Sequence, residues 1–220
     1  MKPIGRLHVL TDSLLQRRFT HLELARFALE GGAEMIQYRR KDAAARVMIE
    51  EAAAIRLLCR RPGIPLIVDD RVDVALAADA DGVHLGDQDL PIPLARDLLG
   101  PHRIIGGSAD NAAEARDRER DGADYTGIGP VFATSSKSDT GPILGLDGLA
   151  RAVRATERPL IAIGGITREN LPSVLATGVH GVAVLSEVCL ADDPAAVVAA
   201  LRRLIDAGWR GSRTVGEHPE

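Results

Sequence analysis

Short runs of apolar residues alternate with longer amphipathic segments along most of this chain. The runs have the length of buried β-strands and lie at 6–11, 35–39, 66–70, 82–85, 104–108, 125–131, 160–164 and 181–186. The segments after them carry apolar residues at helical spacing, at 22–30, 44–60, 73–78, 93–99, 112–121, 146–155, 168–176 and 194–207. The pattern predicts eight strand–helix pairs.

The boundaries between these elements support the same pattern. Pro62 and Pro65 end the second helical segment, and Asp193-Pro194 is suited to begin the last one. The phrases GGAEMI, ADADGVHL, DGADYTGI and TGVHGVAV each place a small-residue turn before a strand, which indicates a repeated β/α unit. We expect one α/β domain over 1–207, a parallel (β/α)8 TIM barrel, with an open doubly wound sheet as the alternative. Residues 208–220 lack periodicity and are expected to be a mobile tail.

Composition narrows the class further. The 220 residues are 45% hydrophobic and only 3% aromatic, which favours an aliphatic β/α interior. A net charge of -4 and the absence of a basic run with aromatics exclude a nucleic-acid surface. We expect no membrane partner, because no apolar run reaches spanning length and no signal peptide is present. Cys59 and Cys189 have no metal-ligand spacing, and this favours a reducing cytoplasm.

A long polar loop follows the apolar run at 125–131. The stretch 127–145 reads GIGPVFATSSKSDTGPILG, with hydroxyl residues, one lysine and a closing Gly141-Pro142. Backbone N–H groups, hydroxyls and an ammonium are the donors that a phosphate requires. Loops too long for a tight turn are usually functional or disordered. This loop is therefore a candidate anion site.

In a barrel the functional side chains collect where the strands end, because the βα loops and the helix N-termini meet there. Asp70 and Asp89 follow neighbouring strands and are candidate Mg²⁺ ligands, since this ion prefers hard oxygen atoms and bridges to phosphates. The alternative is that both carboxylates cap helices. Asp69 and Asp87 are weaker candidates for the ion.

Basic residues follow the second strand. Arg39 and Lys41 lie two positions apart, with Gln37 on the same face, so an anion site is favoured over a solvated charge cluster. Arg40 is expected to be solvated. Gly164-Gly165 permits close approach of the backbone to a phosphate, or merely a tight turn.

The histidines give a weaker signal. His84 lies within an apolar strand, which is more typical of a satisfied core residue than of a catalyst. The others, at 8, 21, 102, 180 and 218, show no metal-ligand spacing and are expected to be structural or exposed. No Ser-His-Asp order, CxxC, P-loop or dinucleotide fingerprint occurs.

Several phrases in a fixed order resemble one enzyme family. They are IQYRRKD, VDDRVDVALAADADGVHLGDQDLP, IIGGSADN, GADYTGIGPVFATSSKSDTGPILGL and IAIGGITRENL followed by GVAVLS. No single phrase is specific, but their joint order from the second to the eighth strand closely resembles the thiamine-phosphate synthase family. That family joins the pyrimidine and thiazole halves of vitamin B1.

The resemblance implies two small-molecule substrates and magnesium. Gln37, Arg39 and Lys41 would bind 4-amino-2-methyl-5-pyrimidinylmethyl diphosphate, with Asp69 near the pyrimidine and with Ser108 and Lys137 completing the diphosphate site. Asp70 and Asp89 would hold Mg²⁺, and Thr134, Ser135, Ser136, Gly165, Leu185 and Ser186 would hold the thiazole phosphate. Arg39, Lys41, Ser108 and Lys137 would be the catalytic residues, because they stabilise the departing diphosphate. A homo-oligomer is left open.

Three positions depart from the family. Asp69 stands where the family usually has Asn, and Ser136 replaces a frequent Thr but keeps the hydroxyl. Asp110 stands where the related thiazole tautomerases carry a proton-transferring His, which argues against a tautomerase. A catalytically silent phosphate-ligand sensor is the third alternative, and the carboxylate at position 69 is the feature that favours it.

Overall fold

The eight strands form one closed parallel barrel in the order β1 to β8. The structure is a computed structural model and describes residues 3–134 and 141–212. The strands are β1 (Leu7–Thr11), β2 (Met35–Tyr38), β3 (Leu66–Asp69), β4 (Gly82–Leu85), β5 (Ile104–Ala109), β6 (Tyr125–Ile128), β7 (Leu160–Ala162) and β8 (Gly181–Val184). Pairing of β1 with β8, with Leu7 opposite Val182, closes the ring. The predicted TIM barrel is confirmed, and the open sheet is wrong.

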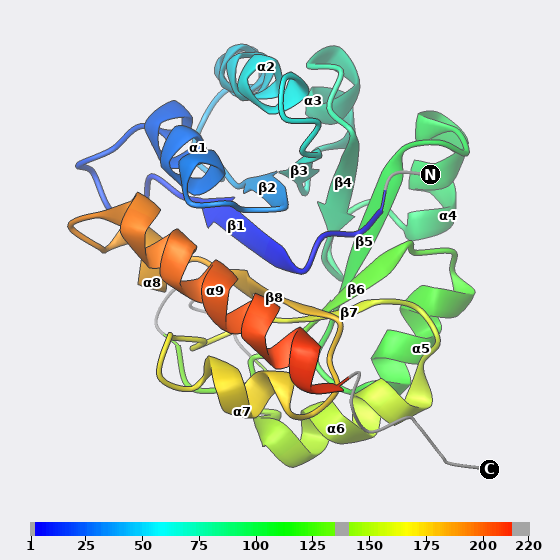
Figure 1. The fold of residues 1–220 in the computed structure, drawn as a ribbon. Helices are drawn as coiled ribbons and strands as arrows, with labels where there is room; N and C mark the ends of the chain where they lie inside the picture. Colours follow the sequence, from blue (N-terminus) through cyan, green and yellow to red (C-terminus); the bar gives the residue numbers. More distant parts are fainter. Residues whose placement is uncertain (1–2, 135–140, 213–220) are drawn as a thin grey trace.

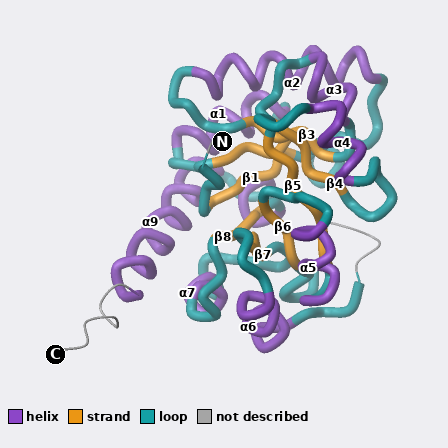
Figure 2. The backbone as a smooth tube through the Cα atoms, turned by 90° about the vertical axis from the view of Figure 1, so that its right-hand side faces the viewer, coloured by secondary structure: helices purple, strands orange, loops and turns teal. Residues whose placement is uncertain are grey.

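Helices surround this barrel, as Figures 1 and 2 show. They are α1 (His21–Glu30), α2 (Ala45–Arg60), α3 (Val72–Ala77), α4 (Ile92–Leu99), α5 (Ala112–Arg120), α6 (Gly145–Ala155), α7 (Leu171–Leu175), α8 (Ser186–Cys189) and α9 (Pro194–Ser212). Local signals fix several starts: Thr20 and Glu23 form a capping box at α1, and the Asn111 side chain accepts from Ala113 N and Glu114 N at α5.

Alternating side chains of each strand build two apolar regions. In β2, Ile36 and Tyr38 pack outward against the helices, whereas Met35 points into the barrel. The interior holds Leu10, Met35, Ile67, Ile104, Tyr125, Ile161 and Ala183. Side chains therefore fill the barrel, and ligands are left with its ends.

Two helical features differ from the prediction. The short α8 lies directly after β8, where no helix was expected. The last helix continues to Ser212, past its predicted end at Ala207 and into the segment expected to be a tail; residues 213–220 lie outside the described residues. Helix α9 continues through Gly208 despite the low helix propensity of glycine, and a Cβ there would lie 3.2 Å from Leu175 Cδ1 of α7. Figure 1 shows α9 lying across the barrel beside α1 and α7.

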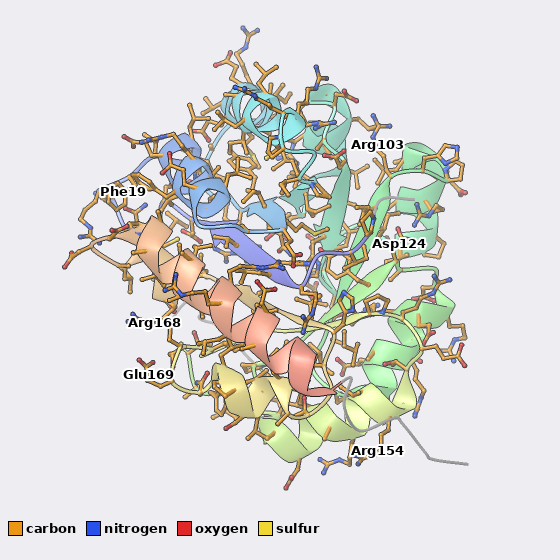
Figure 3. The ribbon with its side chains drawn as sticks, in the orientation of Figure 1. Phe19, Arg103, Asp124, Arg154, Arg168 and Glu169 are labelled. Carbon is orange, nitrogen blue, oxygen red and sulfur yellow. The ribbon has the colours of Figure 1, made fainter. Side chains whose placement is uncertain are left out.

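The parallel topology gives the barrel two different ends. Phe19, Arg168 and Glu169 come from loops that follow β1 and β7, and Figure 3 shows them on one side of the molecule. Arg103 and Asp124, which precede β5 and β6, lie on the opposite side. Within residues 3–134 and 141–212, no helix is long and apolar enough to cross a bilayer.

Candidate active site

The closed parallel barrel places all strand carboxyl ends on one rim. Most predicted site residues lie on or directly after these ends: Gln37, Arg39, Lys41, Asp69, Asp70, Asp89, Ser108, Thr134, Gly165, Leu185 and Ser186. Ser135, Ser136 and Lys137 lie outside the described residues. The structure therefore brings together residues from seven different βα connections or strands, as the sequence predicted.

Three carboxyl groups lie close together after β3 and β4. Asp69 ends β3 and is buried, and its Oδ1 has no hydrogen-bond partner among the described residues. Burial raises the pKa of Asp69 well above its ordinary value, and the negative charge of Asp70 raises it further, against the opposing effect of Arg39. Asp69 is therefore a neutral acid over a wider pH range than an exposed aspartate.

Asp70 and Asp89 form the outer part of this group. Partial burial raises the pKa of Asp89, and Asp70 adds to the rise through its charge and a side-chain hydrogen bond, although Gly86 N donates to Asp89 Oδ2 at 2.6 Å. Asp70 has a left-handed backbone (φ 67°), which Asp tolerates better than most residues. Its N–H donates to His84 O at 2.9 Å, and this bond fixes the turn.

Each predicted cation of the second loop has a carboxylate partner on this rim. Lys41 Nζ lies 2.7 Å from Asp70 Oδ2, so the lysine sits directly beside the acidic group. Arg39 Nη1 donates to Asp12 Oδ2. Asp12 is 2% exposed and also accepts from Leu14 N at 2.7 Å. The loop after β1 therefore holds the Arg39 guanidinium in place.

Gln37 and Ser108 connect the rim with the barrel interior. Gln37 is buried, and its Nε2 lies 3.0 Å from His8 Nδ1 and 3.3 Å from Tyr125 Oη. Ser108 Oγ lies 3.0 Å from His84 Nε2. Arg118 Nε donates to Ser108 O at 2.9 Å, which fixes the serine backbone.

Gly164 and Gly165 follow β7 with φ values of 95° and 65°. A Cβ on Gly165 would lie 2.6 Å from Ala133 O and 2.8 Å from Phe132 Cβ. The loop after β6 and the loop after β7 therefore pack backbone to backbone beside Thr134. Only glycine combines this conformation with this approach.

Some charged residues near the rim are engaged elsewhere. Asp87, a weaker metal candidate, pairs with Arg118. Arg40 pairs with Glu51 and Asp42, so it is an ion-paired residue rather than a merely solvated one. His84 contacts Tyr125 and Ser108, a role that the sequence did not indicate.

Sequence reasoning missed Asp12, His8 and Tyr125. Asp12 directly follows β1, in the position that singled out Asp70 after β3, so the same rule would have found it. His8 and Tyr125 lie within strands and carry no such signal, because an apolar run does not show which of its residues face the interior of a closed barrel.

The donor set near β3 and β4 fits a hard divalent cation. Asp70 and Asp89 are adjacent carboxyl groups, and Asp70 adds to the rise in the Asp89 pKa that burial causes, so a nearby cation would relieve their repulsion. Among residues 3–134 and 141–212, no group of three or more His, Cys, Asp or Glu side chains is arranged to hold a metal. Two carboxylates suit Mg²⁺, which keeps several waters and bridges to substrate phosphates.

A separate cavity of about 390 Å³ lies at the other end of the barrel, with Arg6, Leu160 and His180 among its lining. Arg6 Nε donates to His180 O at 3.1 Å, so this arginine links the starts of β1 and β8. The cavity is remote from the strand carboxyl ends and does not belong to the rim site.

A closed barrel that gathers cations, hydroxyls and paired carboxylates on its carboxyl rim defines an enzyme acting on phosphorylated small molecules. Comparisons with known proteins specify the enzyme family. Residues 7–188 match the family described as thiamine monophosphate synthase. The chain is 50% identical over 209 residues to the thiamine-phosphate synthase of Salinibacter ruber, covering 95% of this chain and 92% of the relative. It is also 50% identical over 200 residues to that of Chloroflexus aurantiacus, covering 91% and 92% of the two chains.

A solved structure agrees with the sequence relatives. The thiamine phosphate pyrophosphorylase from Pyrococcus furiosus superposes with a TM-score of 0.84 at 43% identity, covering 92% of this chain and 96% of that one. The chain therefore belongs to the thiamine monophosphate synthase family.

Proposed function

We propose that this chain is a transferase that joins 4-amino-2-methyl-5-pyrimidinylmethyl diphosphate to thiazole phosphate, yielding thiamine phosphate and diphosphate. Membership of the family over residues 7–188 supports the reaction. The observation that carries it is the rim itself, where Lys41 contacts Asp70 at 2.7 Å and Arg39 is held by Asp12. Cations beside paired carboxylates suit a diphosphate that arrives with a divalent ion.

The pyrimidine diphosphate is assigned to the side of the rim formed by β2, β3 and β5. Gln37 and Asp69 line the buried part and would contact the pyrimidine. Arg39, Lys41 and Ser108 surround the polar part and would bind the diphosphate, joined by Lys137 from the loop after β6. The high pKa of buried Asp69 supports an uncharged carboxyl there, which can donate a hydrogen bond as the amide of Asn does.

Asp70 and Asp89 are the proposed ligands of Mg²⁺, which when bound would neutralise negative charge on the diphosphate. The thiazole phosphate is assigned to the neighbouring side of the rim. Its proposed contacts are Thr134, Ser135, Ser136, Gly165, Leu185 and Ser186. The positive φ of Gly165 supports a turn whose backbone a phosphate can approach closely.

The rim residues have separate roles in the proposed coupling reaction. The bond between the pyrimidine methylene carbon and the diphosphate oxygen breaks, and the bonding electrons leave with the diphosphate. Arg39, Lys41 and Lys137 stabilise the charge that grows on this leaving group, while the aminopyrimidine stabilises the carbocation. The thiazole nitrogen then forms the new carbon–nitrogen bond. No general base is required for these steps.

The alternatives fit less well. A thiazole tautomerase needs a proton carrier, and position 110 holds an aspartate whose backbone N–H donates to Glu114 Oε2 at 2.7 Å. A silent sensor is not favoured, since Lys41 beside Asp70 and the adjacent Asp89 suit the coupling reaction. The relatives described above carry synthase or pyrophosphorylase names.

The compartment and the assembly state are parts of the same proposal. Cys59 and Cys189 are buried and form no disulfide among the described residues, which supports a reducing cytoplasm. A homo-oligomer remains a proposal to be measured by light scattering.

The test is incubation of the protein with both substrates, with and without Mg²⁺, followed by chromatography. The proposed function predicts thiamine phosphate only when both substrates and Mg²⁺ are present. Conversion of the thiazole substrate alone, without metal, would instead identify a tautomerase, and binding of both substrates without product would identify a sensor.

A further inference from the structure

A continuous chain of hydrogen bonds crosses the barrel interior from its amino end to the rim. It starts at Gly5 O, which lies 3.0 Å from His8 Nε2, and His8 Nδ1 lies 3.0 Å from Gln37 Nε2. Gln37 Nε2 also lies 3.3 Å from Tyr125 Oη, which lies 3.1 Å from His84 Nδ1. The last link joins His84 Nε2 to Ser108 Oγ over 3.0 Å.

Gly5 O, at the start of this chain, determines which atom donates in each following hydrogen bond. A backbone carbonyl only accepts, so His8 must carry its hydrogen on Nε2 to donate to Gly5 O. Burial lowers the pKa of His8 to about 3, so the ring is neutral at physiological pH and its Nδ1 is an acceptor. The group facing Nδ1 must therefore be the NH₂ end of the Gln37 amide.

The same amide group determines the next links. Gln37 Nε2 donates its second hydrogen to Tyr125 Oη, so both of its hydrogens are committed and Oε1 remains for a ligand. Tyr125 is fully buried, and its hydroxyl forms hydrogen bonds with Gln37 and His84. The hydroxyl accepts from Gln37, so the acceptor available for its own hydrogen is His84 Nδ1.

His84 then has one possible arrangement. Because Nδ1 accepts from Tyr125, the ring hydrogen lies on Nε2 and is donated to Ser108 Oγ. A His84 ring with a hydrogen on Nδ1 would leave the buried Tyr125 hydroxyl with two incoming donors and no acceptor, which costs about 1–3 kcal/mol. Ser108 Oγ is thus an acceptor toward the interior, and its own hydrogen is available for the rim.

Neighbouring glycines keep space for this chain. A Cβ on Gly106 of β5 would lie 2.3 Å from Tyr125 Cζ and 2.5 Å from His84 Nδ1. A Cβ on Gly127 of β6 would lie 3.0 Å from His84 Cε1. The two rings have centroids 5.5 Å apart with planes at 31°. Strands β5 and β6 therefore fit closely around the rings, which leaves them little freedom to rotate.

We propose that His84 and Tyr125 are positioning residues that hold Ser108 Oγ as an acceptor from His84, so that the Ser108 hydroxyl hydrogen is donated outward to the diphosphate of the substrate. The identity of this ligand rests on the proposed function. The polarity of the hydrogen-bonded chain rests on Gly5 O, on a neutral His8 ring and on the hydrogen bonds described above.

Removing the tyrosine hydroxyl tests the proposal by kinetics. Y125F frees His84 Nδ1 to carry the ring hydrogen, and Ser108 then donates to His84 Nε2 instead of to the ligand. We expect Y125F and S108A each to lower kcat by about tenfold with a smaller change in KM, the effect of one hydrogen bond to a charged group. In the double variant we expect no further loss, because both changes remove the same donation. Additive losses, or a Y125F variant with wild-type kcat, would overturn the proposal.

Tyr38→Phe is the matched control. Tyr38 is equally buried on β2, but its hydroxyl donates outward to Glu51 Oε2 at 2.6 Å and has no link to Ser108. We expect Y38F to lose stability in urea as Y125F does, while its kcat stays within about twofold of the wild type. Equal losses of kcat in both variants would assign the effect to stability and reject the positioning role.

¹⁵N NMR of the histidine rings tests the polarity without any substrate. We expect His8 and His84 of the wild type to carry hydrogen on Nε2 with an unprotonated Nδ1 at pH 7, and Y125F to add a form of His84 protonated on Nδ1. A wild-type His84 protonated on Nδ1, or on both nitrogens, would contradict the proposal. If the wild type makes no thiamine phosphate but shows these forms, the proposed function fails while the polarity stands.

Discussion

Asp69→Asn tests the interpretation of the acidic group most sharply, because it changes a charge and almost nothing in shape. Asp69 is 6% exposed, its Oδ1 has no partner among the described residues, and Asp70 lies beside it in sequence and in space. The amide of Asn cannot ionise, so the variant removes the cost of holding a carboxylate at this position.

The expected change in the free energy of unfolding follows from the burial of Asp69. Each unit by which the folded pKa exceeds the unfolded one costs the wild type about 1.4 kcal/mol at high pH, a cost that the amide of Asn does not have. Because burial and Asp70 raise the pKa of Asp69 well above its usual value, we expect D69N to raise the free energy of unfolding by at least about 1 kcal/mol at pH 8.

The dependence on pH has a definite sign. Well below pH 4, the ordinary pKa of an aspartate, Asp69 is protonated in both the folded and the unfolded chain, so the wild type and D69N should differ little. As the pH rises through the unfolded pKa, the unfolded chain ionises while the folded one does not, and the wild type loses stability until the pH passes the raised folded pKa. The advantage of D69N therefore grows from about pH 4 toward pH 8.

Urea unfolding from pH 4 to pH 8, with EDTA to exclude divalent ions, measures this difference. Asp12→Asn is the matched control, since Asp12 is also buried on the rim but its carboxylate is paired with Arg39. We expect D12N to lower stability at neutral pH by about 1–3 kcal/mol, the opposite sign. A D69N variant less stable than the wild type at pH 8, or a difference that does not change with pH, would refute the reasoning.

Three further outcomes are expected. Lys137→Ala should lower kcat more than substrate affinity, and unchanged coupling in a single turnover would remove this lysine from the mechanism. Asp89→Asn should raise the Mg²⁺ concentration for half-maximal rate by about tenfold, and an unchanged titration would exclude Asp89 as a ligand. Gly165→Ala should lower stability by more than about 1–2 kcal/mol and raise KM for thiazole phosphate. Gly63→Ala, at φ 71° with no atom within 4 Å of the added Cβ, is its control and should cost only the backbone strain; equal losses would show that the contacts of Gly165 are unimportant.

The fold was largely predictable because each strand of the barrel is buried on both sides. A strand such as Leu66–Asp69 is therefore a continuous apolar run, and its polar end marks the rim. What the pattern could not show depends on packing between distant segments. The continuation of α9 past Gly208 was not predicted, because the low helix propensity of glycine favours an end there.

The sequence predicted those site residues whose place on the rim follows from their position after a strand. Residues directly after strands, such as Lys41 and Asp70, had to meet at one rim once the barrel closed. Residues inside strands were not predictable in this way, since the partnership of Tyr125 with Gln37 joins β6 to β2 across the interior. Sequence reasoning assigned Asp69 and Asp70 different roles, but it could not show that Asp69 is buried without a partner for Oδ1 while Asp70 is paired with Lys41.

The central claim is that the charged rim makes diphosphate leave and thiamine phosphate form. The most direct measurement is ³¹P NMR of the wild-type protein mixed with the pyrimidine diphosphate, thiazole phosphate and Mg²⁺. We predict that free diphosphate and thiamine phosphate appear in equal amounts and at the same rate, and that EDTA abolishes both. Persistence of the diphosphate ester in the presence of Mg²⁺, or product formation unaffected by EDTA, would contradict this account.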